Sequence, residues 1–285
     1  MKRIVLLMAV FAAVAVQLRA QTIATFNFHR LGSIEIELFD DKPITVSNFL
    51  KYAASGRFEN QIIHRWVPGF VIQGGGYRVN TSDPQQYEIE RVQIFGTITN
   101  ETRVGTFRSN TFGTIAMARM GNETNSASSQ WFINLDDDNG RPVAEGGSNL
   151  DNASGGYTVF GRVISNANVL NLFVPPPPVN GIHIREDIIP LSPMAVLTTN
   201  ELSWNDLVYV DLSFRREMNL QATRNIRGIR QIAWSSVAGV TNSVDYSANL
   251  TNWVNFTNVV GTGAQMQFTD SSTDAQRFYR VKLLY

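Results

Sequence analysis

The sequence predicts a mainly β protein, built as a β-barrel or a β-sandwich. Its apolar runs are short, and stretches rich in Gly, Asn, Asp and Ser separate them. Only one segment, near the start of the chain, has a helical pattern. Short strands joined by long polar loops are typical of these folds. The runs lie at residues 62–67, 69–73, 114–119, 130–135 and 157–164.

The first twenty residues predict a secretory signal peptide. Lys2 and Arg3 precede an apolar stretch over residues 4–16, and Ala20 offers a small residue for cleavage. The stretch is shorter than the ~20 residues that a membrane-spanning helix needs, although a retained membrane anchor is the alternative. We therefore expect a periplasmic or extracellular protein, with no stable membrane insertion after the signal is cleaved.

Composition excludes several classes of function. Removal of residues 1–20 leaves 21 basic and 24 acidic residues, a net charge of −3 that argues against a nucleic-acid partner. The chain has no cysteine, so it has no disulfide, thiol nucleophile or thiolate metal site. The three histidines fit no zinc motif, and no nucleophile-elbow or phosphate-loop motif is present. We expect neither a cofactor nor a metal.

A strand and a helix open the first domain. Apolar and polar residues alternate from Ser33 to Leu38, the period of a half-buried strand. Asp41 and Pro43 then mark a helix start, and Gly56 marks its end. Between them, apolar residues follow the spacing i, i+3, i+4, i+7 of an amphipathic helix: Val46, Phe49, Leu50 and Ala53.

The chain divides into two domains by pattern and composition. Residues 22–214 form the first domain, because "DLVYVDLSF" at 206–214 still has a strand pattern. The proline-rich segment at 173–181 is therefore interpreted as a loop within this domain, the alternative being a linker. Charged, weakly patterned residues 215–228 are the predicted linker. Five short strand-like runs predict a small antiparallel β-sandwich over 229–285.

An arginine inside an apolar run raises the question of function. Arg65 lies within "IIHRWVPGFVIQ", and a buried arginine is costly unless something pairs with it. It is either a structural ion-pair partner or a pocket residue that meets a ligand. The glycines at 74–76 that follow are interpreted as a turn or a close approach of the backbone. "DDDN" at 136–139 lacks the spaced ligands of a calcium loop, so we expect a solvated loop there.

Three segments are similar to the signatures of cyclophilin-type peptidyl-prolyl cis-trans isomerases, and they occur in that family's order. They are "FENQIIHRWVPGFVIQGGGY" (58–77), "GTIAMARMGNETNSASSQWFIN" (113–134) and "YTVFGRV" (157–163). The resemblance implies an eight-stranded closed β-barrel capped by two helices, with a substrate groove on its outer face. It implies rotation about X–Pro bonds in proline-containing polypeptides, here those of exported proteins.

The resemblance also implies site residues. It gives Arg65 the role of the catalytic arginine, and Phe70 and Phe132 those of the pocket phenylalanines. It makes Gln73 a peptide-contacting residue of the catalytic set. Further substrate-binding positions are Val71, Ala118, Arg119, Gln130, Leu150 and Tyr157. Asn149 stands at the position of the tryptophan that supports cyclosporin binding, so inhibition by that drug is in doubt.

Two alternatives stay open. The first domain could be a proline-peptide binding module without turnover, in a surface or matrix assembly. In the second domain, Trp234, Tyr246 and Trp253 could form a stacking face for glycans or contact a surface, whereas the simpler interpretation is core packing.

Overall fold

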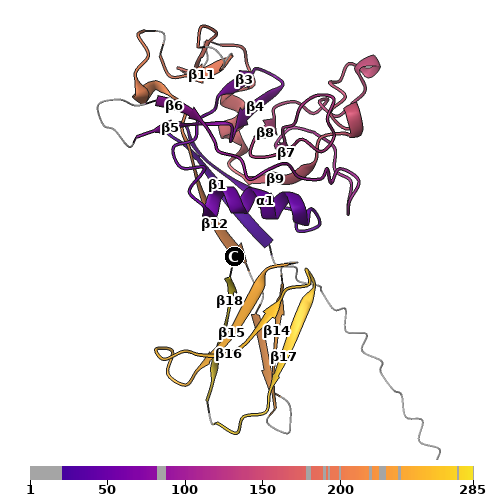
Figure 1. Cartoon of the computed structure of the whole chain (residues 1–285), viewed down its shortest axis with the longest axis vertical. Coiled ribbons are helices and arrows are strands. Elements are labelled where there is room, and N and C mark those ends of the chain that lie inside the picture. Colours follow the sequence, from indigo (N-terminus) through magenta and orange to yellow (C-terminus); the bar gives the residue numbers. More distant parts are fainter. Residues whose placement is uncertain are drawn as a thin grey trace, which may run out of the picture. The chain divides into compact units, whose positions relative to one another are not determined.

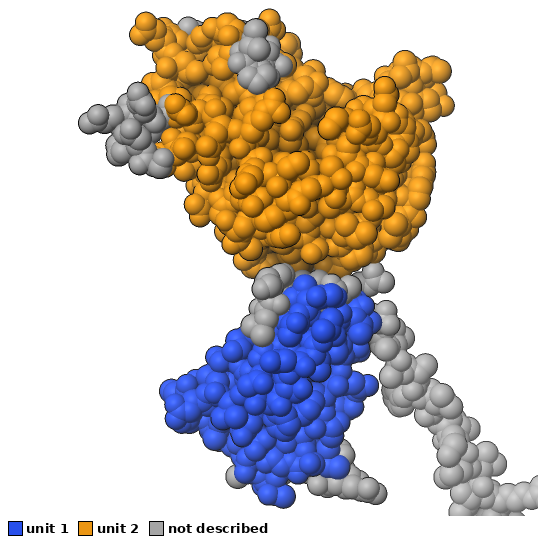
Figure 2. All heavy atoms as spheres, in the orientation of Figure 1, with its two compact units in different colours: residues 1–20, 218–285 blue, residues 21–217 orange. Residues whose placement is uncertain are grey.

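The computed structural model describes most of the chain beyond residue 20. The described residues are 21–81, 88–177, 181–188, 191, 193–198, 200–217, 220–224, 229–236, 239–274 and 276–284. The expected signal peptide at 1–20 lies outside them. The described chain forms two compact units, residues 21–217 and a second unit within 218–285 (Figure 2). Within the described residues, no helix has the length and apolar character needed to span a membrane.

Eight strands of the first unit form one curled antiparallel sheet (Figure 1). Their order across the sheet is β12-β1-β2-β9-β7-β8-β4-β3. The predicted strand at 206–214 appears as β12, which pairs with β1 along its whole length. The mainly β class is therefore confirmed. The strands are β1 (Gln21–Phe28), β2 (Gly32–Leu38), β3 (Arg65–Val67), β4 (Val71–Gly74), β7 (Thr114–Met117), β8 (Trp131–Asn134), β9 (Val159–Ser165) and β12 (Val210–Glu217).

The sheet is an open half-barrel, so the expectation of a closed barrel is wrong. Its edge strands β12 and β3 do not pair along their length. Between the segments that lead into them, the described residues show a single bridge, from Ile62 to Tyr209. The N–H of Trp66 in β3 instead donates to the carbonyl of Pro193 at 2.7 Å. The segment before β11 (Met194–Val196) therefore occupies the edge that closure would need.

One α-helix, α1 (Pro43–Ala54), is present in the described part of the chain, where the sequence predicts it. The second capping helix implied by the resemblance is absent from that part. A six-residue 3-10 helix, η3 (Ala167–Leu172), begins after Asn166 in the left-handed conformation. Prolines from residue 175 onward follow it, and proline removes the N–H that a longer helix requires. Shorter 3-10 turns are η1 (Val143–Glu145), η2 (Ala153–Gly155) and η4 (Trp204–Asp206).

The core lies on one face of the curled sheet. Ile34, Ile36 and Leu38 of β2, the alternating positions predicted to be apolar, are 0–2% exposed. They share a cluster with Phe49 and Tyr52 of α1. Each large apolar side chain buried in this way stabilises the fold by about 1.5–3 kcal/mol. Two hairpins accompany the sheet: β5 (Tyr77–Asn80) with β6 (Glu88–Arg91), and β10 (His183–Arg185) with β11.

The second unit contains two three-stranded sheets. One has the order β13-β14-β17 and the other β16-β15-β18. The strand β13 lies inside the segment 215–228 that we expected to be a linker. Its weak apolar pattern does not indicate a strand, but it forms one by pairing with β14. The strands are β13 (Leu220–Arg224), β14 (Arg230–Ser235), β15 (Thr241–Ser247), β16 (Val254–Val260), β17 (Gln265–Asp270) and β18 (Phe278–Leu284).

The three aromatic residues considered for a glycan-stacking face have different environments. Trp234 is 2% exposed and belongs to the core cluster, where its indole N–H donates to Asn242. The guanidinium of Arg277 lies 3.9 Å from the ring centre of Tyr246. That of Arg280 lies 4.2 Å from the ring of Trp253. Core packing accounts for Trp234, and arginines cover one face of each of the other two rings.

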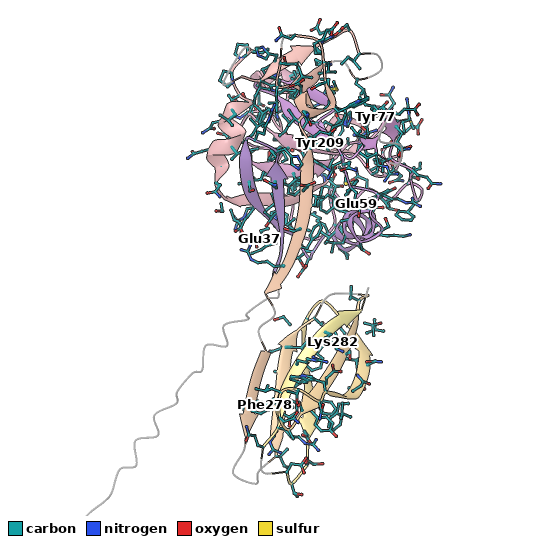
Figure 3. All side chains as sticks on the ribbon, turned by 90° about the vertical axis from the view of Figure 1, so that its left-hand side faces the viewer. Glu37, Glu59, Tyr77, Tyr209, Phe278 and Lys282 are labelled. Atoms are coloured by element: carbon teal, nitrogen blue, oxygen red, sulfur yellow. The ribbon has the colours of Figure 1, made fainter. Side chains whose placement is uncertain are left out.

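A buried carboxylate organises the outer face of the β16-β15-β18 sheet. Asp245 on β15 is 2% exposed and accepts hydrogen bonds from Ser243 and Asn255. Its other oxygen pairs with Arg280 at 2.9 Å and with Lys282, labelled on β18 in Figure 3, at 2.8 Å. Burial acts to raise the pKa of Asp245, but these hydrogen bonds outweigh it and hold the pKa well below its usual range.

This arrangement predicts an acid-sensitive second unit. The folded pKa of Asp245 lies below the unfolded value, so its stabilisation is present above about pH 4 and decreases as pH falls toward the folded pKa. We expect Asp245→Asn to lower the free energy of unfolding at pH 7 by about 1–3 kcal/mol. The variant should also lose less stability than the wild type between pH 5 and pH 2, measured by urea unfolding of the full chain. Identical pH dependence in both proteins would contradict the assignment.

Candidate active site

The register of three neighbouring strands places Arg65, Gln73 and Phe132 side by side. Arg65 on β3 is opposite Gln73 on β4, which is opposite Phe132 on β8. Successive side chains of a strand point to opposite faces, so this row faces away from the core. The next residues along each ladder point into the core: Trp66, Ile72 and Ile133.

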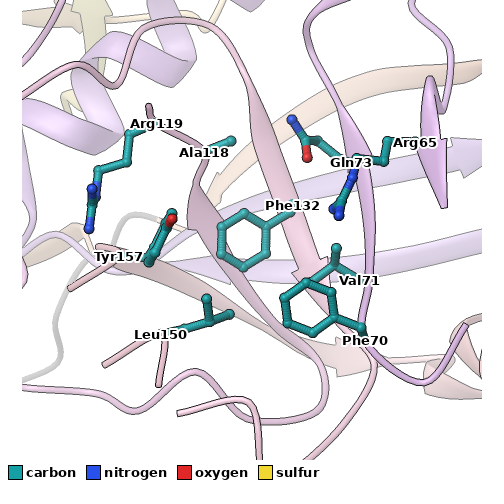
Figure 4. Close-up of a pocket in the computed structure, with 9 residues that line it drawn as sticks. All are labelled: Arg65, Phe70, Val71, Gln73, Ala118, Arg119, Phe132, Leu150 and Tyr157. Atoms are coloured by element: carbon teal, nitrogen blue, oxygen red, sulfur yellow. The ribbon is translucent and has the colours of Figure 1, made fainter. Parts of the chain in front are cut away.

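A pocket of about 230 Å³ opens above this row (Figure 4). In the close-up, Arg65 and Gln73 lie on one side of Phe132, and Tyr157 and Arg119 lie on the other. Nine of the ten predicted site residues line the pocket. They are Arg65, Phe70, Val71, Gln73, Ala118, Arg119, Phe132, Leu150 and Tyr157. The tenth, Gln130, contacts Gln73 rather than the pocket. The structure thus gathers the predicted residues, and their catalytic and binding roles stay predictions.

The floor and walls of the pocket are apolar. Val71, Phe132 and Leu150 are 2%, 4% and 8% exposed and belong to one cluster. Phe70 and Tyr157 are partly buried and pack against that cluster. The rings of Phe132 and Tyr157 meet edge to face at 5.7 Å. These side chains form a hollow suited to a small apolar ring.

Arg65 brings a positive charge to the pocket. Among the described residues, its guanidinium has neither a hydrogen bond nor an ion pair, and the ring of Phe70 lies 5.9 Å from it. Burial lowers the pKa of Arg65, and Tyr157 acts in the opposite direction. An arginine nevertheless stays protonated at neutral pH. Of the two explanations offered by the sequence, the structural ion pair therefore lacks a partner in the described chain, and the guanidinium is available to a ligand.

Arg119 has a different environment, although it lines the same pocket. Its Nε donates to the carbonyl of Gly156 at 3.2 Å, and its Nη1 donates to those of Met120 and Gly121 at 3.1 and 2.9 Å. Nη2 donates to the carbonyl of Ala153. Backbone carbonyls thus accept four hydrogen bonds from this guanidinium, which holds two loops together at the rim of the pocket.

A hydrogen-bond chain fixes Gln73. Its Nε2 donates to Oε1 of Gln130 at 2.6 Å, and Nε2 of His64 lies 3.3 Å from the same oxygen. Burial lowers the pKa of His64 to about 4, outweighing the hydrogen bond to Gln130, so its ring is neutral at pH 7. A neutral ring protonated on Nε2 donates to Gln130. His64 therefore orients the glutamines from behind the pocket.

The three glycines after the apolar run allow close approach of the backbone. A Cβ on Gly74 would lie 2.4 Å from the ring of Trp131, and one on Gly76 would lie 2.9 Å from both Gln130 and His64. Contacts below 3.0 Å are not tolerated without movement. The predicted role of this segment is therefore confirmed.

Sequence reasoning missed a buried asparagine behind the pocket. Asn139, the last residue of "DDDN", is 2% exposed and not solvated as we expected. Asp136 and Asp137 are exposed, and Asp138 pairs with Arg141 at 3.0 Å. The described residues contain no cluster of potential metal ligands. No motif or period distinguishes the buried asparagine from its solvated neighbours, so the sequence offered no signal for it.

Comparison with known proteins identifies relatives of this chain. A family model described as cyclophilin type peptidyl-prolyl cis-trans isomerase/CLD matches residues 22–175. A peptidyl-prolyl cis-trans isomerase of Acinetobacter baylyi is 35% identical over 177 residues, which cover 61% of this chain and 83% of that protein. Peptidyl-prolyl cis-trans isomerase B of Escherichia coli is 38% identical over 141 residues, covering 49% and 77%.

A solved structure is also similar. It is a cyclophilin type peptidyl-prolyl cis-trans isomerase of Cryptosporidium parvum, determined in the presence of the dipeptide Ala-Pro. The sequence identity is 21%, the TM-score is 0.43, and the match covers 68% of this chain and 98% of that one.

The buried His64 predicts a pH dependence of stability. Its folded pKa of about 4 lies below the ordinary 6.5, so between these values the unfolded chain binds a proton that the folded chain excludes. We expect the free energy of unfolding to fall by roughly 3 kcal/mol from this group as pH falls from 6.5 to 4. Denaturant unfolding of His64→Gln, which cannot titrate, should lack that loss. Equal pH slopes for variant and wild type would refute the assignment.

Proposed function

Because the chain belongs to the family of cyclophilin-type peptidyl-prolyl cis-trans isomerases, we propose that it accelerates rotation about X–Pro bonds with Arg65 as the catalytic group. The observation that carries this proposal is the guanidinium of Arg65, which has no hydrogen bond or ion pair among the described residues and lies at the edge of an apolar pocket lined by Phe70 and Phe132.

The chemistry requires no proton transfer and no covalent step. Amide resonance opposes the rotation with a barrier of ~18–20 kcal/mol. Midway through the rotation the C–N bond loses its double-bond character, and the proline nitrogen gains a lone pair that can accept a hydrogen bond. A fixed guanidinium donates to this nitrogen in the twisted state but not in the planar one. Binding that is stronger in the transition state than in the ground state lowers the barrier.

The other pocket residues take roles that follow from their positions. Phe70, Val71, Phe132 and Leu150 hold the proline ring in an environment without water. Gln73, oriented by Gln130 and His64, offers an amide to the peptide. Ala118 and Arg119 lie at the opposite rim, where the residues before proline bind. A 10⁵-fold acceleration requires about 7 kcal/mol, within reach of one charge-assisted hydrogen bond, a dry pocket and a fixed backbone.

The substrates that we propose are proline-containing segments of exported proteins, in the periplasm or outside the cell. This rests on the signal-peptide pattern of residues 1–20. In this setting, slow X–Pro isomerisation, which takes tens to hundreds of seconds, limits the folding of newly exported chains.

Substitution of Arg65 tests the mechanism. We expect Arg65→Ala to lower the rate of cis-trans exchange at saturating peptide by at least about 100-fold, since it removes the donor to the proline nitrogen. NMR exchange spectroscopy on a proline tetrapeptide measures this rate. Arg65→Lys keeps the charge but loses the planar fork, so it should restore only part of the rate.

Arg162→Ala is the matched control. Arg162 is exposed, and its pair with Glu37 is of the surface type that contributes at most about 1 kcal/mol. It should leave the exchange rate unchanged. A wild-type protein that binds the peptide without accelerating exchange would instead support a binding module.

Export has its own test. Expression of the full sequence in a Gram-negative host should place the protein outside the cytoplasm, with a new N-terminus near Gln21 measured by mass spectrometry. Replacement of Lys2 and Arg3 by Glu should retain the longer form in the cytoplasm, because the signal needs its positive start. A full-length protein that stays cytoplasmic would count against the proposed location.

A further inference from the structure

Four buried polar side chains behind the pocket have no part in the mechanism above. They are Asn110, Asn134, Asn139 and Asp151, and each is at most 8% exposed. The amide of Asn134 donates to Oδ1 of Asn110 at 3.3 Å and to Oγ1 of Thr114 at 2.9 Å. Its own Oδ1 accepts from Asn139. A buried polar network with its members satisfied in this way holds its surroundings rigid. We call these four side chains the amide network.

Asn139 joins the amide network to two walls of the pocket. Its Nδ2 donates to the backbone carbonyl of Phe70 at 2.8 Å and to Oδ1 of Asn134 at 2.8 Å. Its backbone carbonyl accepts from the N–H of Leu150 at 2.9 Å. Phe70 and Leu150 are 80 residues apart in the chain. The side chain of Asn139 thus holds the backbone of Phe70, and its main-chain carbonyl holds that of Leu150.

The third wall is tied to the same network. Oδ1 of Asp151 accepts from the backbone N–H and from Nδ2 of Asn110, at 2.8 and 2.9 Å. The same Nδ2 donates to the backbone carbonyl of Tyr157 at 3.2 Å. Ser109 completes the arrangement by donating to the second oxygen of Asp151 at 2.5 Å. The network therefore holds Phe70, Leu150 and Tyr157, whereas no hydrogen bond in the described chain joins it to Arg65.

We propose that Asn139 is a positioning residue that fixes the apolar half of the pocket and thereby sets the affinity for the proline ring. This inference rests on the proposed function of the pocket. When the pocket wall is already ordered, the peptide loses little binding free energy to ordering it. Loss of the amide network therefore weakens binding. The carbonyl of Phe70 also accepts from the N–H of Leu135 at 2.8 Å, so the end of the strand stays attached when Asn139 is changed. Substitution of Asn139 therefore leaves Arg65 in place, and the cis-trans exchange rate of the bound peptide is preserved.

The experiment separates affinity from rate. Full-length wild type and Asn139→Ala are titrated with a proline tetrapeptide by NMR, which yields Kd and the exchange rate of the bound peptide. We expect Kd to rise about tenfold, the effect of one buried hydrogen bond, while the bound rate changes less than about threefold. Arg65→Ala should instead lower the exchange rate of the bound peptide and change Kd much less.

Two further variants keep the test decisive. Asn152→Ala is the matched control, because Asn152 is exposed and its amide oxygen accepts from Arg103 rather than from the amide network; both quantities should stay unchanged. Ser109→Ala is the milder variant, used if Asn139→Ala does not fold. It removes one hydrogen bond to Asp151 and should raise Kd about threefold without changing the bound rate.

The outcomes distinguish this inference from the proposed function. A folded Asn139→Ala or Ser109→Ala with wild-type Kd overturns the inference, as does a loss confined to the bound rate. If the wild type binds the peptide but does not accelerate exchange, the proposed function fails, and the comparison of Kd values still decides the role of Asn139. If the wild type binds no proline peptide, both fail.

Discussion

The ladder of β3, β4 and β8 is the constraint on which the site and the core both depend. Its outward row presents Arg65, Gln73 and Phe132, and its inward row buries Trp66, Ile72 and Ile133. A shift of one residue in β3 would bury a charge and expose an indole. The same apolar burial that stabilises the sheet therefore also keeps the guanidinium at the pocket. No further interaction is needed to place the outward row of Arg65, Gln73 and Phe132.

Two arginines on one pocket show how surroundings decide what a side chain does. Four backbone carbonyls accept hydrogen bonds from Arg119, so its guanidinium holds two loops together. Arg65 is partly buried without such partners in the described chain. A charge in that position interacts more strongly with a ligand than one that is already solvated by the protein. Both residues are arginines, so residue type does not distinguish the structural role from the ligand-binding one. The number of backbone carbonyls near each guanidinium distinguishes them.

The sequence predicted the parts that local pattern controls. The alternation at residues 33–38 and the helix at 43–54 follow from short-range rules, and the glycines at 74–76 were recognised by residue type. All ten proposed site residues came from the family resemblance, and nine of them lie around one pocket. The errors are long-range. Pro193 bonds to Trp66 at the edge where a closed barrel would need β12. The buried amide of Asn139 bonds to the carbonyl of Phe70, 69 residues away.

The pairing of β1 with β12 brings the two ends of the first unit together. β1 begins at residue 21, and its partner β12 ends at residue 217. One edge of β1 therefore has no neighbouring strand until almost the whole unit has been synthesised. Contacts between such distant segments slow folding, and an unpaired strand edge invites association with other chains. Until its last strand is synthesised, a nascent first unit therefore exposes the edge of β1 to other chains.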